Sequence, residues 1–207
     1  MDRLEIKRNA KEIAFQNKMF IWKPILMLMI FALGLEILED ILSISPFMDV
    51  IVILLSLLYV VVTVLFSVAY LNYVVSLTNG VKKDFIQLMK DFQTHLLELF
   101  LLMLIVGVII FLWSLLLIIP GIIASYIYYM VFYVKAMDKS KTNSVVIKEA
   151  KELIKGYKMD FFIFHLSFIP WIILSMVSLG IALIWFVPYY TVAEALYYQK
   201  LVEIKSN

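Results

Sequence analysis

Six long apolar runs constrain this chain more than any other feature of its sequence. They cover residues 19–38, 50–77, 96–119, 122–137, 161–179 and 181–201. About 20 apolar residues suffice for a helix to cross the hydrocarbon core of a bilayer, and within that core an open chain satisfies its backbone groups only as a helix. The sequence therefore predicts an all-α, polytopic membrane protein with six transmembrane helices arranged as three hairpins.

The connections between these runs differ in charge. The connections around Lys82 and from 138 to 158 are basic, whereas the turn that runs from Glu39 through Ser45-Pro46 is acidic, and the turns at 120–121 and 178–180 carry no charge. Cytoplasmic connections of membrane proteins are enriched in lysine and arginine. The pattern predicts a multi-pass protein of the cell membrane with both termini and both basic connections in the cytoplasm.

Composition restricts the partners and the chemistry. The chain has no cysteine, so disulfides, thiolate metal sites and cysteine nucleophiles are excluded. Its net charge is only +2, but the basic residues gather on one side, where an anionic leaflet would attract them. We expect membrane lipids as partners, with other membrane proteins or a second copy of the chain as further candidates, and no nucleic acid.

A basic amphipathic segment precedes each predicted hairpin. The equivalent positions on one helix face are Ile6, Ala10, Ile13, Ala14 and Asn17 in the first segment, Val81, Phe85, Leu88, Met89 and Phe92 in the second, and Val146, Ala150, Leu153, Ile154 and Tyr157 in the third, and all but Asn17 are apolar or aromatic. Each set follows the spacing of one helix face, and Arg8, Lys83 and Lys148 occupy the equivalent basic position. The pattern predicts interfacial helices over 81–96 and 143–157, and a threefold repeat with units 1–77, 78–137 and 138–207. Any interfacial helix shows such spacing, which is the alternative explanation.

Few residues of this chain could serve as metal ligands or catalytic groups. The two histidines, His95 and His165, would need Glu98 or Asp160 to complete the three protein ligands of a catalytic metal site, and no motif supports that set. Sequences typical of zinc proteases, serine hydrolases and P-loop enzymes are absent. We therefore expect a non-enzymatic protein without a metal or another cofactor.

Glu194 is the strongest candidate for a binding residue, because it lies deep within the sixth run, where a carboxylate needs a partner or water. The predicted ligand-binding set is Glu194 with Tyr190 and Tyr197 on one helix stripe, and Tyr126, Tyr129 and Tyr133 on a stripe of the fourth run. Tyrosine hydroxyls at that depth can hydrogen-bond a carboxylate or a lipid headgroup. The alternative is an aromatic belt at the inner membrane interface.

We interpret the other charged residues of the apolar runs as lying near helix ends, and the two prolines as distorting their helices. Glu36 lies near the outer end of its run, and Lys23, Glu98, Lys135 and Asp160 lie near the inner surface, where their side chains are expected to reach the aqueous boundary. Pro170 and Pro188 are expected to distort the fifth and sixth helices, because proline removes a backbone hydrogen bond. Paired broken helices also occur at transport sites.

The second half of the chain carries a specific combination of motifs. It reads L-W-S-L-L-L-I-I-P-G-I-I-A-S-Y-I-Y-Y from Leu112, A-K-E-L-I-K-G-Y-K-M-D-F-F-I-F-H-L-S-F-I-P-W from Ala150, and L-G-I-A-L-I-W-F-V-P-Y-Y from Leu179. In these motifs the chain resembles the bacterial integral membrane family catalogued as domain of unknown function nine-seven-five. The resemblance implies structural roles for Pro120, Gly121, Asp138, Gly156, Lys158, Ser167, Phe168, Trp171, Gly180, Pro188, Tyr189 and Ala195. It implies no activity, and Tyr157 and Pro170 depart from the family pattern.

Two functional hypotheses follow. The first is a non-enzymatic protein of the bacterial cytoplasmic membrane that acts as an accessory or envelope-homeostasis component and binds lipids or membrane partners. The second is a transporter or exporter of small amphipathic molecules, which Glu194, the tyrosine stripes and the two prolines favour. A continuous polar cavity past the middle of the membrane would distinguish the second hypothesis from the first.

Overall fold

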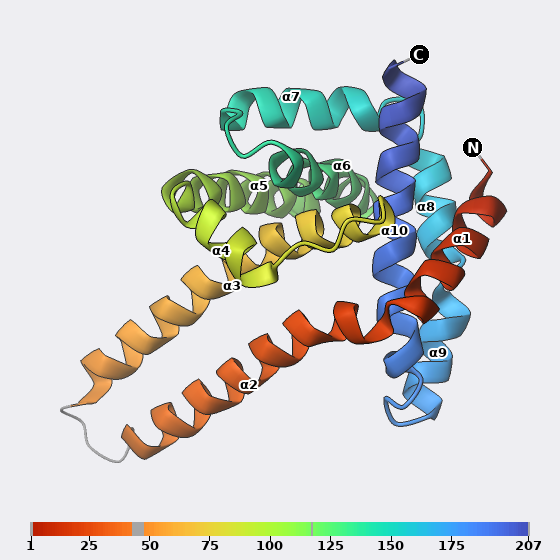
Figure 1. The fold of residues 1–207 in the computed structure, drawn as a ribbon. Coiled ribbons are helices and arrows are strands. Elements are labelled where there is room, and N and C mark those ends of the chain that lie inside the picture. Colours follow the sequence, from red (N-terminus) through yellow and green to blue (C-terminus); the bar gives the residue numbers. More distant parts are fainter. Residues whose placement is uncertain (1, 43–47, 117, 207) are drawn as a thin grey trace.

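The computed structural model describes residues 2–42, 48–116 and 118–206, and over these residues its regular structure is entirely helical (Figure 1). The helices are α1 (Arg3–Gln16), α2 (Lys18–Leu42), α3 (Asp49–Thr78), α4 (Phe85–Gln93), α5 (Leu96–Leu116), α6 (Ile118–Met137), α7 (Asn143–Ile154), α8 (Lys158–Leu166), α9 (Ile169–Val177) and α10 (Leu183–Ser206). The predicted all-α class is confirmed. Ser45-Pro46 of the predicted first turn lie outside the described residues.

Three segments of the described chain, rather than the six predicted, are long and apolar enough to cross a membrane. They are α3, the part of α5 that spans Leu96–Leu115, and the α8–α9 segment Lys158–Val177. The remaining long helices α2, α6 and α10 contain the charged residues Lys23, Lys135 and Glu194, respectively. The structure therefore supports a membrane protein, with three candidate crossings by length and composition.

The helix boundaries correct one predicted connection and one predicted helix. Pro120-Gly121 was expected to form the turn between the third and fourth runs, but both residues lie in the first turn of α6. Proline is tolerated there, because the first backbone N–H groups of a helix have no intrahelical partner. The fifth run is divided at Ser167-Phe168 into α8 and α9, and Pro170 occupies the first turn of α9.

The predicted turn between the fifth and sixth runs is confirmed. Leu179 and Gly180 have φ angles of 50° and 89°, which is the left-handed conformation that glycine adopts without steric cost. The Leu179 side chain at this tip is 94% exposed. α10 then continues through Pro188 as one helix.

The three short amphipathic helices pack in a common way. α4 packs on α3, α7 packs on α6, and α1 packs on α10 at the other end of the chain (Figure 1). The buried members of the predicted stripes are Ile6, Ala10, Ala14, Phe85, Leu88, Phe92, Val146, Ala150 and Ile154. Each stripe thus faces the helix bundle. The threefold repeat of the sequence stays a prediction.

The second amphipathic helix is shorter than expected. Residues 81–84 are not helical, and the Val81 side chain is 52% exposed. α4 begins at Phe85 because the Asp84 carboxylate accepts a hydrogen bond from the Ile86 backbone N–H at 3.0 Å, which is the role of a helix N-cap. The chain then turns at Thr94 and His95 before α5 begins.

The buried core lies at one end of α3 and α5 and along most of α10. On α3, buried side chains begin at Val64, and on α10 they extend from Phe186 to Leu201. The preceding half of α3 and the last part of α5 expose large apolar side chains, such as Ile53, Leu57 and Phe111. In Figure 1 the α2–α3 hairpin extends away from the other helices. Apolar surface of this extent marks an interaction site in a soluble protein and belongs in hydrocarbon in a membrane protein.

Candidate functional site

Glu194 lies inside the bundle, as the sequence predicts. Its side chain comes from the middle of α10 and the residue is 3% exposed. The Tyr129 hydroxyl on α6 donates to Oε2 at 2.7 Å, and His165 Nε2 on α8 lies 3.0 Å from Oε1. The contact between Glu194 and the tyrosine stripe of the fourth run is confirmed. A buried carboxylate with two partners connects three helices that are distant in sequence.

The hydrogen bonds of His165 fix the number of protons in this pair. Its Nδ1 lies 2.9 Å from the Phe161 carbonyl oxygen, and a carbonyl only accepts, so Nδ1 carries a proton. One further proton then lies between Nε2 and Glu194. The pair is therefore either an imidazolium with a carboxylate or a neutral imidazole with a carboxylic acid, and its net charge is zero in both forms.

The other predicted tyrosines have different environments. Tyr133 is buried beside Tyr129 and stacks on Tyr198 at a ring distance of 5.0 Å. Tyr190 packs edge-on against the His165 ring at 5.9 Å. Tyr197 donates to Asp160 at 2.9 Å rather than to Glu194. The Tyr126 side chain lies outside the described residues.

The sequence does not predict the partner of Glu194 on α8 or a buried hydroxyl on α3. It indicates His165 only as a possible metal ligand and gives Tyr70 on α3 no role. The Tyr70 hydroxyl is buried and has no hydrogen bond of standard geometry within the described part of the chain, although Thr191 of α10 lies beside it. His165 meets Glu194 through packing between distant helices, which no local pattern in the sequence indicates.

Lys135 is fully buried, and the prediction that it reaches the aqueous boundary is wrong. Its Nζ donates to the Glu98 carboxylate at 2.8 Å, to the Lys139 carbonyl at 2.9 Å and to the Lys141 carbonyl at 2.7 Å. The three protons of the ammonium group are thereby all used. Lys135 occupies the last turn of α6, where a basic side chain can bind the carbonyls that follow the helix, and it fixes the connection to α7.

The two histidines belong to separate clusters. His95 Nδ1 lies 3.6 Å from Glu98, whereas His165 contacts Glu194. Among the residues that the structure describes, no group of three histidine, aspartate or glutamate side chains is arranged to hold a metal ion.

Several residues of the family pattern stabilise chain turns. The Asp138 carboxylate accepts hydrogen bonds from the Ser140 hydroxyl at 2.6 Å and from its backbone N–H at 3.1 Å, and these bonds lower the Asp138 pKa below its usual value. Gly156 has a φ of 88° between α7 and α8, and Lys158 begins α8. Trp171 stacks on Phe186 at 6.1 Å, next to the turn of Pro188.

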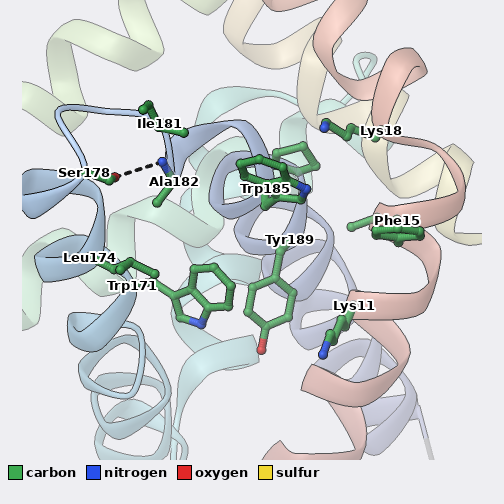
Figure 2. A pocket seen from close by; sticks show the side chains of 12 residues that line it. Lys11, Phe15, Lys18, Trp171, Leu174, Ser178, Ile181, Ala182, Trp185 and Tyr189 are labelled. Atoms are coloured by element: carbon green, nitrogen blue, oxygen red, sulfur yellow. Dashed lines mark hydrogen bonds between the residues drawn. The ribbon is translucent and has the colours of Figure 1, made fainter.

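A cavity of about 610 Å³ lies between α1, α9 and the first turns of α10 (Figure 2). It is lined by Lys11, Ala14, Phe15, Lys18, Trp171, Leu174, Ser178, Ile181, Ala182, Trp185, Pro188 and Tyr189. Its volume is in the usual range for small-molecule sites. In the sequence, Lys11, Phe15 and Lys18 have the i, i+4, i+7 spacing of one helix face, but no pattern there marks a cavity.

The polar groups of this cavity lie on opposite sides of an aromatic wall. In Figure 2 the amine of Lys11 and the hydroxyl of Tyr189 lie at the same end, near the indole of Trp171. Lys18 lies at the other end, with its Nζ 4.7 Å from the centre of the Trp185 ring. The predicted site residue Glu194 is not among the lining residues, so this cavity and the Glu194 cluster are distinct.

The comparisons with known proteins identify a family without an assigned activity. The family model described as "Protein of unknown function (DUF975)" matches residues 114–205. The match confirms the resemblance that the motifs of the second half of the chain indicate. Neither a curated protein nor a solved structure matches the chain.

Proposed function

We propose that this protein is a non-enzymatic component of the bacterial cytoplasmic membrane that crosses it six times and binds membrane lipids or membrane partners, as an accessory or envelope-homeostasis component. The observation that carries the proposal is that basic residues are exposed at one end of the helices while apolar side chains are exposed along the arms of α2, α3 and α5. Arg8, Lys83 and Lys148 are exposed on or next to α1, α4 and α7, whose apolar stripes face the bundle. Basic groups that border an apolar surface favour an anionic leaflet.

Length supports six crossings in three hairpins. α2 has 25 residues, α6 has 20 and α10 has 24. At about 1.5 Å per residue, each helix is long enough for a hydrocarbon core of about 30 Å. The charged residues in these helices either lie near their ends or, like Glu194 and Lys135, have partners inside the protein, which lowers the cost of insertion.

The test is the composition of the lipid that remains with the protein. After gentle extraction, mass spectrometry should find anionic phospholipids enriched over their share of the source membrane. Charge reversal at Arg8, Lys83 and Lys148 should remove the enrichment, whereas reversal of Lys90, which is also exposed, should remove only part of it. Lipid in the proportions of the source membrane, or none, would contradict the proposal.

The Glu194 cluster favours transport as a second candidate function. A buried carboxylate and imidazole that share one proton can exchange it when a ligand binds. In vesicles with an internal pH-sensitive dye, an ethidium gradient should then move protons, and Glu194→Gln should abolish the signal. Equal proton movement in vesicles with and without the protein would exclude transport of this probe.

A further inference from the structure

We infer that the cavity between α1, α9 and α10 binds one anionic glycerophospholipid, with the phosphate at Lys11 and Tyr189 and an acyl chain along the aromatic wall. The inference rests on the proposed function and assigns one site and one class of lipid to it.

Charge complementarity indicates an anionic ligand. The lining contains two lysines and no carboxylate. Lys11 is exposed and has no ion pair or hydrogen bond within the described residues, and neither the Tyr189 hydroxyl nor the Trp171 indole N–H has a hydrogen bond there. One cation with two neutral N–H or O–H donors at the same end of the cavity suits a phosphate group, as Figure 2 shows.

The remainder of the lining suits a hydrocarbon chain. Leu174, Ile181 and Ala182 lie beyond the tryptophans. Ile181 and Leu174 are exposed, at 62% and 50% of their surface, so an acyl chain in the cavity would cover apolar surface that otherwise faces the surroundings. Tryptophan and tyrosine side chains that lie beside both a basic group and an apolar surface are typical of the membrane interface.

α1 is held in position by contacts other than those of the cavity. Near its start, Arg3 Nε lies 3.5 Å from Asp160 on α8. In the middle, Lys7 Nζ lies 4.4 Å from the centre of the Phe168 ring, and burial lowers the Lys7 pKa. Lys11 is therefore presented to the cavity by a helix that does not require Lys11 for its own packing.

The experiment measures lipid binding to the purified full chain by native mass spectrometry. Dioleoyl phosphatidylglycerol should bind more tightly than dioleoyl phosphatidylcholine. Lys11→Gln with Tyr189→Phe should weaken phosphatidylglycerol binding on the order of tenfold. The matched control, Lys155→Gln at the end of α7, where the lysine side chain is exposed, should not change it. Because Lys11 is exposed and Tyr189→Phe only removes a hydroxyl, unchanged thermal unfolding midpoints should show that the variants fold.

A second arm tests the acyl chain. Ala182→Phe should weaken binding of the dioleoyl lipid more than binding of dihexanoyl phosphatidylglycerol. Wild-type affinity in the Lys11–Tyr189 double variant would overturn the inference, and so would complete displacement of the dioleoyl lipid by glycerol phosphate, which would mean a site for the headgroup alone. Failure of the wild-type protein to bind either dioleoyl lipid would instead contradict the proposed function as well.

Discussion

Glu194 and Lys135 are the buried charged residues of the described part of the chain, and each is held by partners from other elements. Glu194 joins α10 to α6 and α8, and Lys135 joins the end of α6 to α5 and to the following connection. A buried charge is costly without partners, so removal of the charge and removal of a partner have different consequences.

The first prediction concerns Glu194. Glu194→Leu leaves the Tyr129 hydroxyl and His165 Nε2 without their partner, and should cost about 3 kcal/mol of stability. Glu194→Gln keeps an acceptor for Tyr129 and should cost about half of that. The measurement is thermal unfolding in detergent. Glu36→Leu is the control, because Glu36 is exposed, and an equal loss in both leucine variants would contradict the buried cluster.

The second prediction concerns Lys135. Lys135→Met removes three donated hydrogen bonds, to Glu98 and to two backbone carbonyls, and should destabilise the protein by about 3 kcal/mol. It should also increase proteolytic cleavage in the connection between α6 and α7. Lys148→Met, at an exposed position of α7, should change neither property. Equal cleavage of both variants would mean that Lys135 does not hold the connection.

At the scale of elements, the sequence predicts the features that depend on local pattern and misses those that depend on packing between distant helices. The apolar runs indicate the long helices, and the i, i+4, i+7 pattern indicates which face of α1, α4 and α7 is buried, because both signals depend on neighbours along one helix. The residues that meet Glu194 come from α6 and α8. The partner on α6 was predicted from the tyrosine stripe, but the pairing with His165 depends on tertiary packing, which no local pattern records.

The third prediction tests the buried stripe of α7. Ile154 is fully buried against the bundle, so Ile154→Asp should cost more than about 3 kcal/mol. Leu153 is only partly buried, and Leu153→Asp should cost less. Val145→Asp, at a position that is already exposed, should change stability by less than about 1 kcal/mol. Spin labels along α7 should show accessibility with a period near 3.6 residues; uniform accessibility would contradict the packing.

At the scale of the molecule, the basic connections lie at one end of the described helices, and the arms of α2, α3 and α5 expose apolar side chains toward the other. The buried ions Glu194 and Lys135 lie within the core, and Lys139 reaches back to the Asp91 carbonyl at 3.2 Å. The exposed turn at Leu179 lies at the far end of the α9–α10 hairpin (Figure 1). This polarity matches the asymmetry of lysine and arginine in the sequence.

The fourth prediction follows from that polarity and tests the orientation in the membrane. The chain has no native cysteine, so single cysteines report cleanly. Leu179→Cys places a thiol at the 94% exposed tip of the α9–α10 hairpin, and it should react with an impermeant maleimide applied to intact cells. Ser140→Cys and Ser206→Cys lie at exposed positions near the basic end and should react only after the cells are opened. Because lysine and arginine resist translocation to the outer side, the reverse labelling pattern would overturn the topology. Labelling of Leu179→Cys and Ser140→Cys from the same side would show that the hairpin does not cross the membrane.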